Sequence, residues 1–349
     1  MSHETATARQ RSPRRFGVAF GIAVAVLVVV IVTSFLMGRF PVSPLEALRI
    51  IASHVVPIEP TWQAMDAKVV WEVRLPRVIM AVLVGAALSC SGTAYQGVFR
   101  NPLVSPDILG VSAAASLGAA IAILWRDAYS PSVQLLAFVF GIAGVFIAYF
   151  LAYTRGTVPN TTLILAGIVT SSLFNAGVSV TKYLADPLDE LPAITFWLMG
   201  SLSSVRWENL TFAAPVIIAG VVGLWLASWR LNVLTMGDDE ARSLGINTTR
   251  LKAVVIVCAT ALTATAVSQV GTIGWIGLVI PHAARIVVGP DHRKLMAAAA
   301  VMGATFLLLI DNLTRSASET SLPLSIPIAF IGAPFFAILL RRSTRQWSR

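Results

Sequence analysis

Polar side chains that could take part in chemistry or binding are few in this chain, and they gather in short stretches between long apolar ones. The longest such stretch runs from Met236 to Asn247, MGDDEARSLGIN, and holds three consecutive acids. Inside an apolar segment, His282 and Arg285 are three residues apart, so they share one helical face. Groups of this kind could bind a charged partner or line a polar path, and their spacing indicates no bond-breaking chemistry.

Several kinds of catalytic or metal site are excluded by their missing motifs. The sequence has no GxxxxGK[ST] loop, so we predict no ATP hydrolysis by a P-loop mechanism in this chain. It has no HExxH motif, and its four histidines are scattered, which makes a zinc site improbable. Cys90 and Cys258 lie in apolar segments and are interpreted as small core residues. We therefore predict no catalytic residue, no metal site and no cofactor bound by this chain.

The composition is that of a membrane protein. Hydrophobic residues make up 56% of the 349 residues, charged residues make up 12%, and the mean hydropathy is +0.78. A soluble domain usually has about 25% charged residues. The net charge of +9 could suggest a nucleic-acid partner, but the basic residues lie in short loops between apolar spans. That pattern sets membrane topology, and we expect no nucleic acid.

About ten segments could cross a bilayer, since about 20 helical residues span the hydrocarbon layer. The first has no convincing cleavage site and is predicted to be retained. The segment 276–289 is short and flanked by glycines, which favours a bent or broken helix covered by protein. Leu191–Ser204 is too short to cross and is predicted to be an interfacial or partly buried helix against the outer end of the span before it. The ten segments are 16–37, 75–98, 108–125, 134–153, 161–182, 210–229, 250–270, 276–289, 294–312 and 326–341.

Ten crossings place both termini on one side of the membrane. The excess of Lys and Arg on that side predicts that it is the cytoplasm. We expect a cytoplasmic tail at 1–15, one transmembrane domain at 16–342 and a second tail at 343–349. The segments 74–97 and 250–271 share a basic start and an Ala-rich middle, weakly suggesting an inverted repeat.

The polar stretch at about 237–247 is predicted to form a helix of roughly two turns. Asp238 or Asp239 could cap its N-terminus, and Gly245 could end it. Ala241, Leu244 and Ile246 would then be available to a partner protein. A solvated connector is the alternative.

The run Arg74–Ala120 carries a family resemblance. In order, RLPR, VGAAL, SGTAYQ, FRNPL and PDILGVS resemble the FecCD-type permease subunits of type II ABC importers. GTIGWIGLVIPH is similar to the family's GxIGFIGLVxPH, with Trp275 where the family usually has Phe. LSIPIAFIGAPFF departs from the family's PVG-like turn, since Ile326-Pro327 keeps the proline but lacks the glycine. The resemblance covers roughly Arg74–Arg342.

The resemblance implies an all-α polytopic membrane protein of about ten transmembrane helices with the BtuC-like ABC importer permease fold. It implies a permease subunit, not an enzyme, in the bacterial inner membrane, moving a ferric siderophore or, next, haem. The expected partners are a second copy of the chain, two ABC ATPase subunits that bind ATP and Mg, and a periplasmic or lipid-anchored substrate-binding protein. A cobalamin importer, an ion-coupled secondary transporter and an intramembrane enzyme are the alternatives.

The resemblance also implies roles for individual residues. GDDEARSLGI resembles the helix that couples to the ATPase, which assigns coupling to Asp239, Glu240, Ala241, Arg242, Leu244 and Gly245. RLPR and the arginine before the last span assign binding-protein docking to Arg74, Arg77 and Arg315; interfacial snorkelling is the alternative. The translocation gate is assigned to Asn101, Leu103, Asn160 and Thr161, although Asn101-Pro102 also suits a plain turn. Arg285 is expected to face protein, a water-filled cavity or the inner interface.

Overall fold

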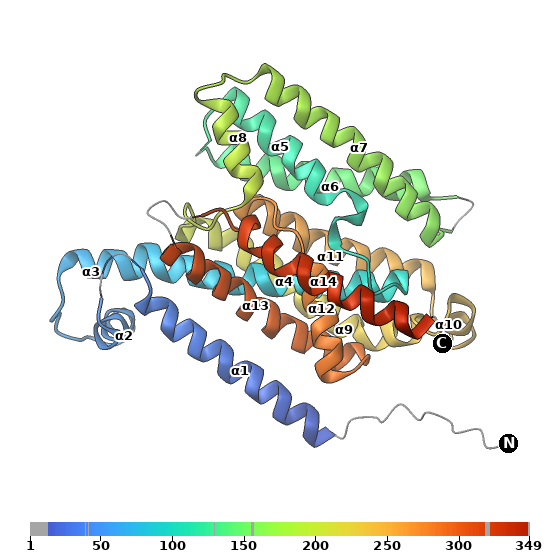
Figure 1. Cartoon of the computed structure of the whole chain (residues 1–349), viewed down its shortest axis with the longest axis horizontal. Helices are drawn as coiled ribbons and strands as arrows, with labels where there is room; N and C mark the ends of the chain where they lie inside the picture. The colour runs from blue at the N-terminus through green and yellow to red at the C-terminus, as the bar shows by residue number, and fades with distance from the viewer. Residues whose placement is uncertain are drawn as a thin grey trace.

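The protein is a bundle of helices, shown in the computed structural model of Figure 1. The structure describes residues 13–38, 40, 42–128, 130–154, 157–317 and 322–347. Within these ranges, seven helices are long and apolar enough to cross a membrane, and three shorter apolar helices accompany them. Together they correspond to the ten predicted segments. Residues 1–12 of the expected N-terminal tail lie outside the described residues.

Long helices make up most of the bundle. α14 (Ser325–Trp347) continues through most of the segment expected to be the C-terminal tail. The others are α1 (Pro13–Leu36), α4 (Leu75–Phe99), α6 (Pro131–Ala152), α7 (Asn160–Leu184), α9 (Trp207–Leu234), α11 (Thr248–Val270) and α13 (His292–Ala317).

α4 lies in the middle of the bundle, with α9, α11 and α13 around it, while α5, α6 and α7 form a neighbouring layer (Figure 1). Small residues allow this close packing. A Cβ added at Gly92 would lie 1.8 Å from the Gly277 carbonyl oxygen, and one at Gly85 would lie 2.3 Å from that of Gly303. The backbones therefore touch directly, as is typical of helix interfaces in lipid.

Two of the apolar helices are short and start inside the bundle. α5 (Val111–Trp125) follows a 3-10 turn, Pro106–Leu109, and α12 (Ile276–Val288) follows a non-helical segment after α11. The two starts meet, because a Cβ at Gly277 would lie 2.4 Å from Pro106 Cγ. The predicted interruption before residue 276 is thus confirmed, and protein covers the non-helical backbone.

The two ends of the bundle carry different short helices. α10 (Asp238–Ser243) marks one end, called here the α10 end. α2 (Pro44–Ser53) and α3 (Ala64–Lys68) lie at the other, the α2 end (Figure 1). α8 (Glu190–Met199) confirms the predicted short helix. α2 and α3 were not predicted.

Candidate functional site

α10 begins differently from the prediction. Gly237, with φ +147°, precedes the helix, and neither Asp238 nor Asp239 caps it with its side chain. Asp238 instead accepts a hydrogen bond of 2.7 Å from Lys252 Nζ on α11. The predicted aspartate cap is therefore wrong, because the ammonium group of Lys252 takes up the carboxylate that would have folded back onto the helix.

One face of α10 is open and one is covered. Leu244, just after the helix, is 64% exposed, and Asp239, Glu240, Arg242 and Gly245 are exposed as well. Ala241 is 0% exposed, so the expectation that it is available to a partner is wrong for this side chain. Its methyl group packs inside the chain and anchors α10. The Arg242–Asp239 ion pair of 3.3 Å is solvent-exposed and contributes little stability.

Lys252 joins α10 to three spans. Besides Asp238, its Nζ donates to Asn160 Oδ1 at the start of α7, at 3.1 Å. Asn160 Nδ2 in turn donates to the Val98 carbonyl near the end of α4, at 3.1 Å. Arg100 lies 3.7 Å from the other oxygen of Asp238. We name Asp238, Lys252 and Asn160 the coupling network. Sequence analysis missed Lys252, whose signal was a lone lysine inside an apolar span.

The four predicted gate residues lie at the α10 end but differ in their surroundings. Asn101 Oδ1 accepts from the Leu103 backbone N–H at 2.9 Å and so closes the turn after α4. Asn101, Leu103 and Thr161 are exposed, whereas Asn160 is half-buried in the coupling network. The turn and Asn160 are connected through α4.

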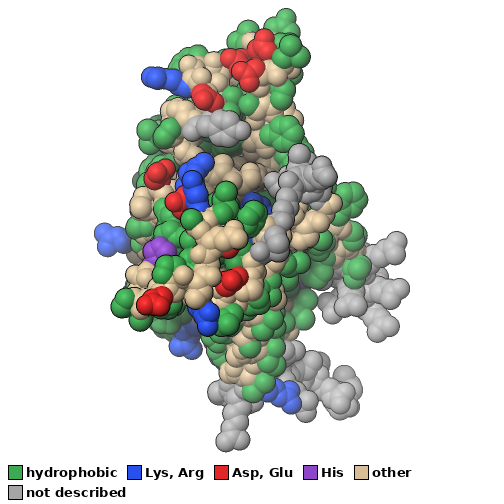
Figure 2. Space-filling view, turned by 90° about the vertical axis from the view of Figure 1, so that its left-hand side faces the viewer, with side chains coloured by type: hydrophobic (Ala, Val, Ile, Leu, Met, Phe, Trp, Pro, Cys, Tyr) green, Lys and Arg blue, Asp and Glu red, His purple; other side chains and the backbone are tan. Residues whose placement is uncertain are grey.

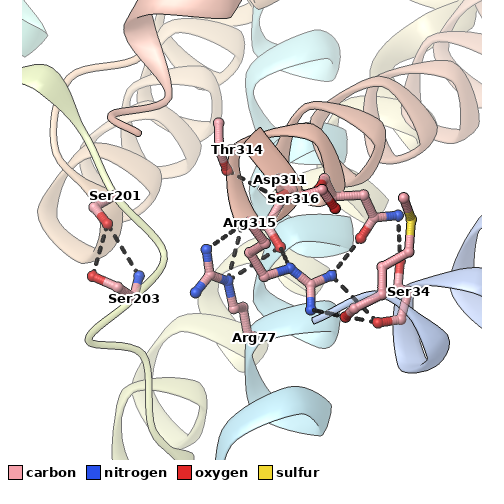
Figure 3. Close-up of polar contacts among 10 residues, drawn as sticks. Ser34, Arg77, Ser201, Ser203, Asp311, Thr314, Arg315 and Ser316 are labelled. Atoms are coloured by element: carbon pink, nitrogen blue, oxygen red, sulfur yellow. Dashed lines mark hydrogen bonds and ion pairs between the residues drawn. The ribbon is translucent and has the colours of Figure 1, made fainter. Parts of the chain in front are cut away.

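The α2 end holds a buried ionic cluster around Asp311 of α13 (Figure 3). Arg77 of α4 donates to Asp311 through Nε and Nη2, at 2.8 to 3.1 Å. Arg315 Nε lies 3.1 Å from Asp311 Oδ2. The Asp311 side chain is 0% exposed, and those of Arg77 and Arg315 are 10% and 9% exposed. We name these three residues the Asp311 cluster.

Arginine side chains at this end also bind the segment that follows α1. Arg74 donates to the Phe35 and Phe40 carbonyls and is buried. Arg315 donates to the Met37 carbonyl at 3.2 Å. Asn312 donates to Ser34 Oγ at 2.8 Å. The three predicted docking arginines thus direct their guanidinium groups into this chain.

The outer face of the α2 end carries separate acidic and basic side chains among apolar ones, with no single basic patch in this view (Figure 2). Exposed arginines do occur in this region: Arg49 of α2, Arg126 after α5 and Arg206 before α9. Sequence analysis also missed the Asp311 cluster, although an aspartate four residues before an arginine is a visible pairing signal.

A cavity of about 230 Å³ opens at the α10 end, between the ends of α4, α9 and α12 and the start of α13. Arg285 lines it and donates to Gln96 Oε1 at 3.2 Å, which confirms the expectation that Arg285 faces protein or a cavity. The full lining is Gln96, Arg100, Asn101, Pro102, Thr235, Arg285, Pro290 and His292.

Comparison with known proteins decides the family. Residues 26–342 match the FecCD transport family, which is most of the chain. The chain belongs to this family. The molybdate import system permease MolB of Haemophilus influenzae is 39% identical over 317 residues, covering 90% of this chain and 92% of that protein. The cobalamin import system permease BtuC of Halobacterium salinarum is 40% identical over 274 residues, covering 78% and 73%.

A solved structure supports the same assignment. A metal-chelate type ABC transporter in an inward-facing conformation superposes with a TM-score of 0.82 at 36% identity, covering 93% of this chain and 99% of that one. The FecCD membership and this likeness establish an all-helical ABC importer permease with the BtuC-like fold. The predicted fold class and family are confirmed.

Proposed function

We propose that this FecCD permease moves an iron chelate, a ferric siderophore first and haem next, across the bacterial inner membrane. Two copies of the chain form the passage, and two separate ATPase subunits bind ATP and Mg and supply the energy. A periplasmic or lipid-anchored binding protein delivers the cargo to the α2 end, and both termini and α10 face the cytoplasm. Family membership supports the importer role, and the exposed face of α10 is the observation that carries the coupling assignment.

The coupling network suggests how ATPase movement reaches the passage. Asp239, Glu240, Arg242, Leu244 and Gly245 form the surface that meets the ATPase. Ala241, being buried, holds α10 to its own chain. When the ATPase moves α10, the Asp238–Lys252 ion pair pulls on α11, and the Lys252–Asn160 hydrogen bond carries the displacement to α7. Movement of this one short, rigid helix would thereby shift the equilibrium between two packings of the spans.

The gate proposal follows from the same contacts. Asn160 and Thr161 begin α7, and Asn101 and Leu103 form the turn after α4. Asn160 hydrogen-bonds both to Lys252 and to the Val98 carbonyl. A displacement of α10 therefore changes the distance between the start of α7 and the end of α4. A constriction built from these four residues would open and close with α10.

The binding protein docks at the α2 end in this proposal. Arg74, Arg77 and Arg315 contribute indirectly, by holding the docking surface in place. Their guanidinium groups are engaged inside the chain, so exposed Arg49, Arg126 and Arg206 would make the direct ionic contacts. Such rim charges mainly accelerate and orient association. Charge reversal at the three exposed arginines should slow capture of the binding protein while lowering stability little. Charge reversal at Arg77 could not separate these two effects, because Arg77 is part of the buried Asp311 cluster.

A second cargo class is favoured by one relative. The import system of MolB carries molybdate, an oxyanion, and MolB covers 90% of this chain. BtuC, 40% identical, belongs to a cobalamin import system and keeps cobalamin among the candidates. All of these cargoes would cross by the same alternation of packings.

The test is uptake into proteoliposomes that contain this chain with its ATPase and binding protein. ATP-dependent uptake of a ferric siderophore, abolished when the ATPase is omitted, is the expected result. Uptake driven by a proton or sodium gradient without the ATPase would indicate a secondary transporter instead. Binding of the cognate binding protein to ferric siderophore, haem, cobalamin and molybdate, each measured by calorimetry, distinguishes the cargoes.

A further inference from the structure

The cavity at the α10 end has a strongly cationic lining. Arg100 and Arg285 both face it, His292 lies beside them, and no Asp or Glu is among its eight lining residues. By its volume of about 230 Å³ it has room for several water molecules or one small solute. The coupling network accounts for part of the charge of Arg100, through Asp238, but neither it nor the Asp311 cluster accounts for Arg285.

Arg285 lacks a counter-ion among the residues that the structure describes. Its recorded side-chain contact is the neutral amide oxygen of Gln96, and its Nε is buried without a hydrogen-bond partner. Arg100 differs, since Asp238 lies 3.7 Å away and offsets part of its charge. Arg285 is half-buried and lines the open cavity, but its buried Nε–H lacks the partner that such a group normally has. A bound anion would supply the counter-ion that Arg285 lacks.

The nearby carboxylate of Asp291 is directed elsewhere. It accepts from Asn232 Nδ2 at 2.7 Å and from the Arg293 backbone N–H at 3.1 Å, and it pairs with the Arg293 side chain at 3.7 Å. Partial burial raises the pKa of Asp291, but these hydrogen bonds and the charges of Arg293 and Lys294 outweigh it and lower the pKa overall. Asp291 is thus ionised and already engaged with Asn232 and Arg293.

His292 forms part of the cavity wall. The residue is buried, and its Nδ1 lies 3.0 Å from Asn232 Oδ1. Asn232 gives its amide N–H to Asp291, so its oxygen must accept from His292 Nδ1–H. In the neutral ring, Nε2 then carries a lone pair, and it is buried toward Gly97 of α4, where an added Cβ would lie 2.7 Å from it. The charge of the lining therefore comes from the two arginines.

From these observations we infer an anion-binding site in this cavity, with Arg285 and Arg100 as charge partners. The matching chemical class is a small carboxylate or oxyanion, such as the anionic part of a chelate leaving the passage. Its assignment to cargo rests on the proposed importer function, whereas anion binding itself does not. The phosphate of a lipid headgroup shares the charge but is a different source.

The experiment measures binding of citrate by calorimetry to the full chain in nanodiscs of phosphatidylcholine alone, without the ATPase. Citrate should bind the wild type, and Arg285→Gln should weaken binding about tenfold or more, because bonds to charged groups are the strong ones. Arg285→Lys should recover part of the affinity. The matched control is Arg250→Gln, which removes an exposed arginine at the same end and should change affinity less than twofold. Monodispersity and thermal midpoint verify folding of each variant.

The site as a whole can be overturned by the same titrations. Absence of citrate binding, or equal weakening by Arg285→Gln and Arg250→Gln, would do so.

The lipid source is separated by repeating the titration with phosphatidylglycerol in the discs. Citrate binding in purely zwitterionic discs supports a soluble anion, and occupancy by phosphatidylglycerol alone overturns the cargo assignment. Citrate binding without ATP-dependent uptake would contradict the importer proposal and leave the site standing. Normal ATP-dependent uptake with no anion binding would contradict the site and leave the importer proposal standing.

Discussion

Replacement of Asp311 by asparagine tests what holds the α2 end together. The side chain keeps its shape but loses the charge that faces Arg77 and Arg315. Three short hydrogen-bond contacts from Arg77 and the 3.1 Å contact with Arg315 depend on that charge. α13 would then present a neutral amide to two buried guanidinium groups, at the point where α4 and the end of α1 meet it.

The expected loss is large because none of the three side chains has water to replace its partner. Asp311 is 0% exposed, and the two arginines are 10% and 9% exposed. Removing one partner of a buried pair costs about 3–5 kcal/mol, since the remaining charge is left uncompensated. Here two positive charges remain, so we expect Asp311→Asn to destabilise the protein by at least the lower figure.

The assay is reversible unfolding in detergent micelles, followed by circular dichroism. Asp189→Asn makes the same chemical change at an exposed aspartate and should alter stability by less than about 0.5 kcal/mol. The double variant Arg77→Gln with Asp311→Asn should lose less than the sum of the single variants, because one unpaired cation disappears with its partner. An Asp311→Asn protein within about 1 kcal/mol of the wild type would refute the reasoning.

Three further predictions concern coupling and packing. Lys252→Met removes the ion pair between α10 and α11 and should lower cargo moved per ATP hydrolysed several-fold; an unchanged ratio in proteoliposomes contradicts the coupling network. Exchanging the charges, Glu240→Arg with Arg242→Glu, should uncouple ATPase activity from uptake, and normal coupled uptake would count against contact between α10 and the ATPase. Gly92→Ala places a methyl group against backbone of α12 and should cost about 1–3 kcal/mol in an unfolding assay. Gly17→Ala, with no atom within 4 Å of the added methyl group, should not destabilise the protein, because alanine favours the helix over glycine.

The membrane class, the apolar spans and the family could be predicted from sequence because each depends on local composition or on motif order. A helix needs about the same number of apolar residues to cross the bilayer wherever it lies in the bundle. The break before α12 was also predictable, since Gly271, Gly274 and Gly277 mark it within a few residues. α2 was missed because its ten residues are too few to cross the bilayer, although the Ser43 cap, whose side chain accepts from the Glu46 backbone N–H, is a visible start signal.

The partners of the charged side chains could not be predicted, because they are separated by long stretches of chain. Arg77 and Asp311 are 234 residues apart, and Lys252 and Asn160 are 92 apart. An arginine at the start of a span reads the same in sequence whether it reaches water or a buried carboxylate. Likewise, Asp238 can cap a helix or meet Lys252, and only the approach of α11 decides between them.

Taken by itself, the sequence determined that this protein lies in lipid, roughly where its spans begin and end, and which transport family it belongs to, since hydrophobicity and motif order are properties of the chain. The tertiary structure alone decided which charges are paired and which face a cavity. That division has a physical cause, because a side chain's electrostatic partner depends on which helices pack together, and packing is set by contacts between residues far apart along the chain.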